Sequence, residues 1–293
     1  MRVSTLGAGT MGQGIAHASA LAGHKVTLRD IKSEYVEAGL DTIRENLNEG
    51  VRREKVAQSE ADEAFDRIEG HVDIEPAVSE TDLVVEAVPE EIELKQETLE
   101  TIEAVVPDDA MLATNTSSLS VTEIMSPLKR PQRGLGLHFF NPAYLMPLVE
   151  VVAGEQTVPS TINDAKTFVE SLNKTPIEVQ DSPGFASSRL GVALSAEAMR
   201  MVQEGIATPA DIDAAMELGY SYPMGPIELG DVVGLDVRLD ILEYLRQELG
   251  ERFRPLQILK RKVRAGKLGK KSDEGFYQWE NGEKVGVAED GNR

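Results

Sequence analysis

Three glycines near the N-terminus constrain the fold of this chain more than any other feature. Gly7, Gly9 and Gly12 follow a short apolar run, residues 2–6, and precede an Ala-rich stretch that stops at Gly23. In this G-x-G-x-x-G spacing the first glycine permits a tight turn, the second lets the backbone approach a pyrophosphate, and the third lets helix and strand pack closely. The pattern predicts a strand, a turn and a helix whose N-terminus binds a dinucleotide.

An acidic residue follows where such a unit meets the adenosine ribose. The predicted second strand, residues 25–28, leads into Asp30, 18 residues beyond Gly12. A carboxylate there would hydrogen-bond the ribose hydroxyls and repel a 2′-phosphate, which favours NAD over NADP. Arg29 and Lys32 weaken this preference, and a helix-capping role for Asp30 is the alternative. The residues expected to bind NAD here are Gly7, Gly9, Thr10, Met11, Gly12 and Asp30.

The remainder of the first 180 residues alternates between strand-like and helical segments. Polar helical stretches at 33–58 and 60–65 predict a helical hairpin insertion near 33–65. The apolar runs "DLVVEAV", "AMLATNTSS", "GLGLHFF" and "LVEVVAG" are separated mainly by helical segments. This alternation predicts an α/β fold, a Rossmann-like, doubly wound and mostly parallel sheet covered on both faces.

The pattern changes after "VEVQDSPGF". From Ser187 onward we find no strand-like run, and helical stretches are predicted at 189–204, 209–217 and 227–249. At 293 residues the chain is long enough for a large domain and a smaller one. We therefore expect an NAD-binding domain at 1–181 and an all-helical domain for substrate binding and dimerisation at 182–293.

Composition excludes several classes of function. Thirty basic against fifty acidic residues give a net charge of −20, which argues against binding nucleic acid or an anionic membrane. The chain has no cysteine, so disulfides, thiolate zinc sites and cysteine nucleophiles are excluded, and no metal site is expected. Without an 18-residue apolar run or a basic-then-apolar leader, the expected location is the cytoplasm.

A lone histidine and a lone glutamate stand out in the run "GLHFFNPAYLMPLVEV". His138 and Glu150 lie at predicted strand ends, and sheets of this kind bind ligands at the carboxyl ends of their strands. An imidazole that titrates near neutrality can take a proton from an alcohol and return it to a ketone. A carboxylate on its other ring nitrogen would fix the tautomer. The pair predicts acid–base chemistry, although a single histidine is more often structural.

The polar segment "TNTSS", residues 114–118, also follows an apolar strand and can face the same crevice. Ser117 is the residue there that we expect to donate a hydrogen bond to a substrate oxygen. The alternative is a hydroxyl that serves a turn or caps a helix.

Six segments resemble one enzyme family along essentially the full length of the chain. They are "LGAGTMGQGIA", "NTSSLSVTEI", "GLHFFNPAYLMPLVEVV", "DSPGF", "LGYSYPMGPIELGDVVGLD" and "GKKSDEGFY". Together they resemble the L-3-hydroxyacyl-CoA dehydrogenases, which include the 3-hydroxybutyryl-CoA dehydrogenases, in their stand-alone form. The resemblance implies NAD-dependent oxidation of a 3-hydroxyacyl-CoA to a 3-ketoacyl-CoA, in fatty-acid β-oxidation or 3-hydroxybutyryl-CoA metabolism, by a homodimer.

The resemblance also implies roles for single residues. His138 would be the catalytic base, Glu150 its partner, and Ser117 a hydrogen-bond donor to the 3-oxygen of the substrate. Asn141 would contact both cofactor and substrate. The residues implied to line the nicotinamide half of the cofactor site are Glu90, Lys95, Asn115 and Asn141.

One position departs from the family pattern. The family usually has Asn before an Arg after "PGF", whereas "GFASSR" puts Ser188 there. Losing one hydrogen bond costs roughly 0.5–1.5 kcal/mol, so this change alone should not abolish activity, and Ser188 stays among the expected catalytic residues.

The phosphates of CoA need basic groups, and Arg52 and Lys55 in "VRREK" are the candidates. A solvated charged face is the alternative.

Two rival functions remain open at this stage. One is a related dehydrogenase of a free hydroxy acid or sugar acid such as gulonate. The other is a catalytically silent NAD-binding protein of the crystallin type. The preferred acyl chain length does not follow from the sequence.

The acidic residues are scattered over predicted helical faces, which suggests a surface adapted to a high-salt cytoplasm. The alternative is simply an acidic protein. Because salt screens the mutual repulsion of exposed carboxylates, the hypothesis predicts a melting temperature that rises in molar KCl. A melting temperature that stays constant across the KCl series would rule it out.

Overall fold

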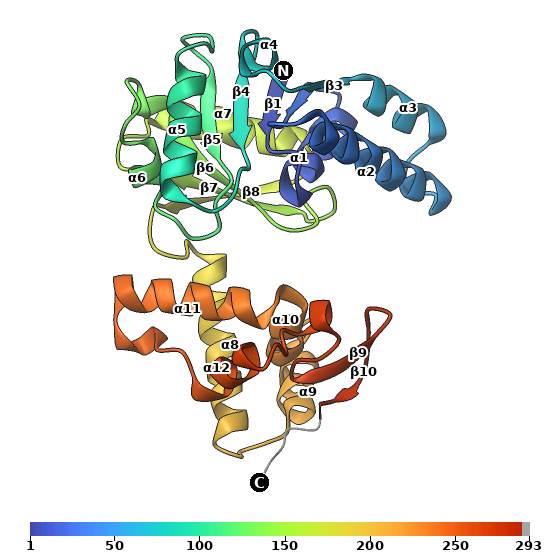
Figure 1. Cartoon of the computed structure of the whole chain (residues 1–293), viewed down its shortest axis with the longest axis vertical. Helices are drawn as coiled ribbons and strands as arrows, with labels where there is room; N and C mark the ends of the chain where they lie inside the picture. The colour runs from blue at the N-terminus through green and yellow to red at the C-terminus, as the bar shows by residue number, and fades with distance from the viewer. Residues whose placement is uncertain (289–293) are drawn as a thin grey trace. The chain divides into compact units, whose positions relative to one another are not determined.

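The computed structural model describes residues 1–288, which belong to two compact units (Figure 1). Unit 1 runs from Met1 to Ser182 and unit 2 begins at Pro183.

Unit 1 is built on an eight-stranded sheet in the order β3-β2-β1-β4-β5-β6-β7-β8. The strands are β1 (Arg2–Leu6), β2 (Lys25–Arg29), β3 (Ile68–His71), β4 (Leu83–Glu86), β5 (Met111–Thr114), β6 (Gly134–Phe139), β7 (Leu148–Ala153) and β8 (Thr175–Gln180). The only antiparallel pair among them is β6 with β7. The prediction of a mostly parallel Rossmann-like sheet is therefore confirmed.

Helices flank this sheet (Figure 1). They are α1 (Thr10–Leu21), α2 (Ser33–Arg52), α3 (Gln58–Asp66), α4 (Ile74–Val78), α5 (Ile92–Glu103), α6 (Val121–Met125) and α7 (Pro159–Ser171), with a 3₁₀ turn at Pro131–Arg133. Every residue of β4, β5 and β6 is buried, so both faces of the central sheet are covered. This explains why the strands read as continuous apolar runs rather than as alternating patterns.

Unit 2 is mainly helical, with α8 (Ser187–Gln203), α9 (Pro209–Tyr220), α10 (Pro226–Val233), α11 (Leu235–Leu249) and α12 (Gln257–Arg264). The expectation of a domain without strands was wrong in one place. Strands β9 (Tyr277–Glu280) and β10 (Glu283–Val287) form an antiparallel hairpin. The signal was present, because Asn281 and Gly282 both have positive φ, the conformation that an Asn-Gly hairpin turn requires. The predicted helix 227–249 is also divided, at Gly234 (φ +107°).

Two buried aspartates hold unit 2 together. Asp213 accepts hydrogen bonds from the N–H of Ile227 (2.8 Å), at the first turn of α10, and from the Tyr277 hydroxyl (2.6 Å). Asp231 accepts them from the N–H groups of Phe276 (3.0 Å) and Tyr277 (2.9 Å) and from the Trp279 indole (3.1 Å). Burial raises the pKa of both carboxyls. The hairpin is thus fastened to the helices by side chains rather than by sheet pairing.

No helix in the described part of the chain is long and apolar enough to cross a membrane.

The loop that joins β6 to β7 packs on α1. The rings of His17 and Tyr144 stack with 4.6 Å between centroids and 11° between planes. A Cβ at Gly14 would lie 3.1 Å from the Ala143 Cβ, so a larger residue there would push the loop away. His17 is 3% exposed, and burial, with a smaller contribution from the charge of Lys174, lowers its pKa to about 4.

This histidine should make the fold acid-sensitive. The unfolded chain takes up a proton near pH 6.5 but the folded chain only near pH 4, so stability falls as the pH drops through that window. A shift of this size corresponds to about 3 kcal/mol. In urea denaturation between pH 7 and 4, His17→Phe should lose stability less steeply than the parent. His71→Phe, which alters a more exposed ring, is the control; equal pH dependence of all three proteins would contradict the assignment.

Candidate active site

The glycine turn has the geometry of a dinucleotide-binding loop. Gly7 adopts φ +99°, and a Cβ on it would lie 2.5 Å from the Ala87 carbonyl oxygen. A Cβ on Gly12 would overlap the Gly7 carbonyl oxygen at 1.7 Å, whereas one on Gly9 would meet nothing within 4 Å. Because Gly9 is the N-cap of α1 and provides no side-chain cap, the first turn, with Thr10 and Met11, presents its N–H groups to an anion. These residues fit the pyrophosphate of NAD.

Asp30 lies directly after β2 and contacts the same turn. Its carboxylate accepts hydrogen bonds from the N–H groups of Ala8 (2.7 Å) and Ile31 (2.6 Å). The N-cap of α2 is Lys32, so Asp30 does not cap that helix. A carboxylate has about four acceptor positions, which leaves capacity for ribose hydroxyls.

His138 and Glu150 meet across the antiparallel pair β6 and β7. They lie directly opposite each other in the strand register, and His138 Nδ1 is 2.6 Å from Glu150 Oε2. Their exposed fractions are 5% and 0%. Each group thus makes the burial of the other tolerable, because a buried charge without a partner is very costly. With Nδ1–H directed at the carboxylate, Nε2 becomes the nitrogen able to exchange a proton with a ligand.

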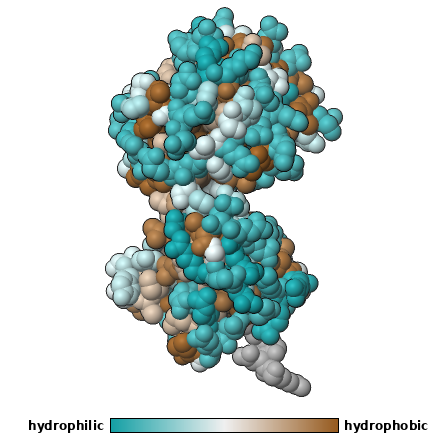
Figure 2. Space-filling view, turned by 90° about the vertical axis from the view of Figure 1, so that its left-hand side faces the viewer, coloured by the Kyte–Doolittle hydropathy of each residue, from teal (hydrophilic) through white to brown (hydrophobic). Residues whose placement is uncertain are grey.

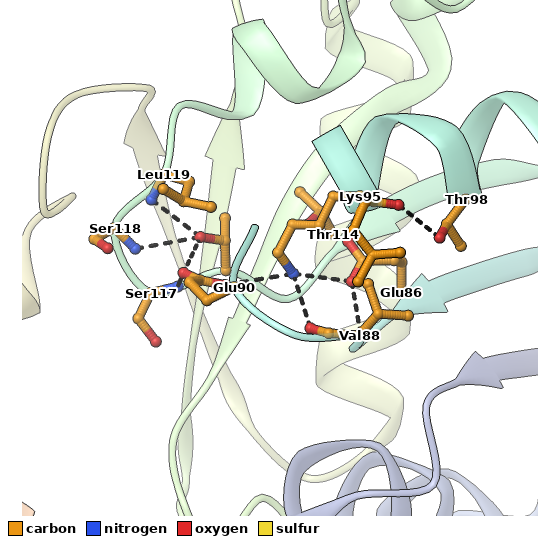
Figure 3. Close-up of polar contacts among 11 residues, drawn as sticks. Glu86, Val88, Glu90, Lys95, Thr98, Thr114, Ser117, Ser118 and Leu119 are labelled. Carbon is orange, nitrogen blue, oxygen red and sulfur yellow. Dashed lines mark hydrogen bonds and ion pairs between the residues drawn. The ribbon is translucent and has the colours of Figure 1, made fainter. Parts of the chain in front are cut away.

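The loop that carries Ser117 is held by Glu90. Glu90 Oε1 accepts hydrogen bonds from the Thr116 hydroxyl (2.5 Å) and from the Ser117 N–H (3.0 Å) (Figure 3). The Thr116 oxygen in turn accepts from the N–H of Leu119 (3.0 Å). Ser117 is exposed and its side chain points away from this network, while Ser120 caps α6. The capping alternative for Ser117 therefore does not apply.

A buried ion pair lies behind Glu90. Lys95 Nζ is 2.9 Å from Glu86 Oε1 and 3.4 Å from Glu90 Oε2, and the side chains of Lys95 and Glu86 are both 0% exposed (Figure 3). Glu86 also accepts from the Thr114 hydroxyl at 2.7 Å. The amino group of Lys95 is thus enclosed by protein groups. It contacts the Ser117 loop only indirectly, through its ion pair with Glu90. Glu86 was missed from the sequence, although an acid inside the apolar run "DLVVEAV" was the available signal.

Asn115 connects this loop to the histidine strand. Its side-chain oxygen accepts the Phe139 N–H at 3.0 Å, next to His138. Asn141 is exposed at the start of the loop after β6. The glycine turn, Asp30, the Ser117 loop and His138 all lie toward the same sheet edge, because β1, β2, β4, β5 and β6 are parallel neighbours.

Three further expected residues belong to α2, the segment after it, and α8. Arg52 ends α2 with its side chain 67% exposed and pairs with Glu49, which also binds Arg53 at 2.5 Å. Lys55 is exposed just beyond α2. Sharing of one carboxylate by two arginines is in keeping with a solvated charged face. Ser188 belongs to unit 2, in the first turn of α8.

The Glu86–Lys95 pair yields a stability prediction. Removing the cation in Lys95→Met leaves Glu86 buried and unpaired, which should cost about 3–5 kcal/mol in urea denaturation. Adding Glu86→Gln replaces the unpaired, buried carboxylate with a neutral amide, so the double variant should be more stable than Lys95→Met alone. The surface pair Arg67–Glu63 is the control, and Arg67→Met should cost under about 1 kcal/mol. A double variant less stable than Lys95→Met would refute the proposed charge compensation.

Comparisons with known proteins identify the family of this chain. The family model described as 3-hydroxyacyl-CoA dehydrogenase, NAD binding domain, matches residues 2–182, and the model of the C-terminal domain matches residues 184–279. A probable 3-hydroxybutyryl-CoA dehydrogenase of Bacillus subtilis is 41% identical over 280 residues, covering 95% of this chain and 97% of that protein. The 3-hydroxyadipyl-CoA dehydrogenase of Escherichia coli is 39% identical, covering 94% of this chain and 58% of that protein.

Solved structures give the same result. The crystal structure of (S)-3-hydroxybutyryl-CoA dehydrogenase PaaH1 from Ralstonia eutropha superposes with a TM-score of 0.92 at 37% identity, covering 96% of this chain and 99% of that one. The chain therefore belongs to the 3-hydroxyacyl-CoA dehydrogenase family and is an NAD-dependent oxidoreductase.

Proposed function

We propose that this dehydrogenase interconverts L-3-hydroxyacyl-CoA and 3-ketoacyl-CoA with His138 as the acid–base group. The observation that carries the proposal is the buried contact of 2.6 Å between His138 Nδ1 and Glu150 Oε2, at the sheet edge where the glycine turn lies. Relatives named 3-hydroxybutyryl-CoA dehydrogenases make the four-carbon thioester the first substrate to test. The proposed settings are fatty-acid β-oxidation or 3-hydroxybutyryl-CoA metabolism in the cytoplasm.

The chemistry divides between the cofactor and the chain. NAD, when bound, supplies the acceptor for the hydride that leaves C3 of the substrate. His138 Nε2 takes the proton of the 3-hydroxyl as the carbonyl forms, and Glu150 stabilises the resulting imidazolium. The Ser117 hydroxyl donates a hydrogen bond to the same oxygen. In the reverse direction the imidazolium returns the proton to the ketone oxygen.

The remaining residues orient these groups. Glu90 holds the Ser117 N–H, and Asn115 holds the backbone beside His138, so hydroxyl and imidazole belong to one hydrogen-bonded frame. Asn141 and Ser188 are proposed to contact the substrate, and Arg52 and Lys55 to attract the CoA phosphates.

Unit 2 is proposed to form the homodimer. It exposes large apolar side chains, among them Leu190 (72%), Leu218 (86%) and Tyr220 (73%). Figure 2 shows apolar side chains on the surface of this unit. Burying such a surface between two copies would remove it from water, and sedimentation of the chain as a 31.9 kDa monomer would refute this.

Activity of His138 variants tests the mechanism. With acetoacetyl-CoA and NADH, His138→Gln should lower kcat by about 10²–10⁴-fold, because proton transfer loses its positioned donor. NADH binding by fluorescence and the unfolding midpoint should stay near the parent values. His71→Gln in unit 1 is the matched control and should retain the parent kcat. A His138→Gln variant with parental kcat would refute the assignment.

The same assay separates the rival functions. Free acetoacetate with NADH, and gulonate with NAD, test the acid-specific dehydrogenases. A wild-type protein that binds NADH but turns over none of these substrates would favour the silent NAD-binding protein.

A further inference from the structure

The position of the Ser117 hydroxyl depends on the backbone that carries it. Among the described residues none forms a hydrogen bond with this hydroxyl, which points away from the Glu90 network in Figure 3. The Ser117 loop, residues 115–120, connects the end of β5 to the start of α6. Under the proposed function the hydroxyl must meet the substrate oxygen, so the contacts that fix the two ends of this loop also place the donor.

The end of the loop next to β5 is fixed by contacts to the neighbouring strand and its following segment. The N–H of Asn115 donates to the Glu86 carbonyl oxygen at 2.7 Å. Glu90 accepts hydrogen bonds from the Thr116 hydroxyl and the Ser117 N–H. These contacts do not reach the other end of the loop, where it enters α6.

A carboxylate that follows the last strand of unit 1 fixes this other end. Asp181 comes directly after β8, and its Oδ2 accepts the Ser120 hydroxyl (2.8 Å) and the Thr122 N–H (2.8 Å). Its Oδ1 accepts the Val121 N–H at 3.1 Å. Hydrogen bonds to an ionised acceptor are roughly twice as strong as neutral ones. The first turn of α6 is therefore held by a group 60 residues further along the chain.

Asp181 is itself fixed to the strands of the acid–base pair. Its N–H donates to the Ala153 carbonyl oxygen at 2.9 Å, which continues the parallel pairing of β8 with β7. Strand β7 also carries Glu150, the partner of His138. The carboxylate that holds the Ser117 loop is thus built on the same part of the sheet as this pair.

We propose that Asp181 is a positioning residue for the reaction, because it holds the Ser117 loop so that the hydroxyl meets the same substrate oxygen as His138. This inference rests on the proposed dehydrogenase function and adds a residue that acts through the backbone. Without the carboxylate, the start of α6 loses three hydrogen bonds and the hydroxyl can shift. A misplacement of about 1 Å can cost on the order of 100-fold in rate.

A double-mutant cycle in the reduction of acetoacetyl-CoA by NADH tests this inference. Ser117→Ala should lower kcat by about 10–100-fold, because the charge that develops on the oxygen loses a donor. Asp181→Ala should lower kcat by roughly tenfold, with a smaller change in KM, since the hydroxyl matters most in the transition state. Adding Asp181→Ala to Ser117→Ala should lower kcat no further, because the hydroxyl to be positioned is already absent.

Two further variants separate positioning from a general loss of stability. Glu103 is a matched carboxylate of unit 1, since it accepts the N–H groups of Lys129 (2.7 Å) and Arg130 (2.9 Å) after α6. Glu103→Ala should lower the midpoint of urea unfolding but keep the parental kcat. Asp181→Asn retains one acceptor oxygen, so it should lose less kcat than Asp181→Ala, and it supplies the cycle if Asp181→Ala does not fold.

The outcomes distinguish this inference from the function beneath it. An Asp181→Ala variant with parental kcat, or one whose loss adds in full to that of Ser117→Ala, would overturn the positioning role and leave the dehydrogenase intact. So would a Glu103→Ala variant that loses as much kcat, or a Ser117→Ala variant that loses none. Failure of the wild type with every CoA thioester would instead refute the proposed function.

Discussion

The contact between the His138 imidazole and the Glu150 carboxylate depends on strand register, and the candidate site depends on that contact. Side chains alternate between the faces of a sheet, so a slip of one residue between β6 and β7 would send the two groups to opposite faces. Register is fixed because both strands are almost fully buried and have apolar neighbours on each side. The packing of the sheet thus sets the geometry of the proposed proton-transfer pair.

Other buried charged groups of the molecule also have an ionic or hydrogen-bonding partner. Glu86 is paired with Lys95, and Asp231 receives three donors from the hairpin segment. Lys95 and Glu86 join the consecutive elements α5 and β4, whereas Asp231 joins α10 to a segment about 45 residues further along the chain. In both cases a polar contact fixes the relative position of secondary structures within a unit. Arg238 departs from this pattern, because its buried Nε has no hydrogen-bond partner among the described residues.

Net charge and site charge have separate consequences. An overall charge of −20 repels anions at long range. The uncapped N–H groups in the first turn of α1 would nevertheless attract a pyrophosphate at contact distance, where salt screens little. Arg52 attracts an anion less strongly than a free arginine would, because its charge is partly neutralised by the ion pair with Glu49. We therefore expect binding of an anionic cofactor and of the proposed substrate to depend on local hydrogen-bond donors rather than on the field of the whole surface.

The sequence by itself determined the elements whose causes are local. The spacing of Gly7, Gly9 and Gly12 dictated a turn because steric exclusion acts between near neighbours, and continuous apolar runs marked buried strands because both faces of a parallel sheet are covered. The hairpin after Tyr277 was also encoded locally, in Asn281 and Gly282, but its short strands carry little apolar signal.

Only the tertiary structure decided which partner each buried polar group would find. The family resemblance implied that Lys95 lines the cofactor site, and the structure shows its amino group paired with Glu86 and Glu90. The contacts of Asp231 with Phe276 and Tyr277 depend on distances between residues far apart in the chain, which no local pattern of residue types specifies.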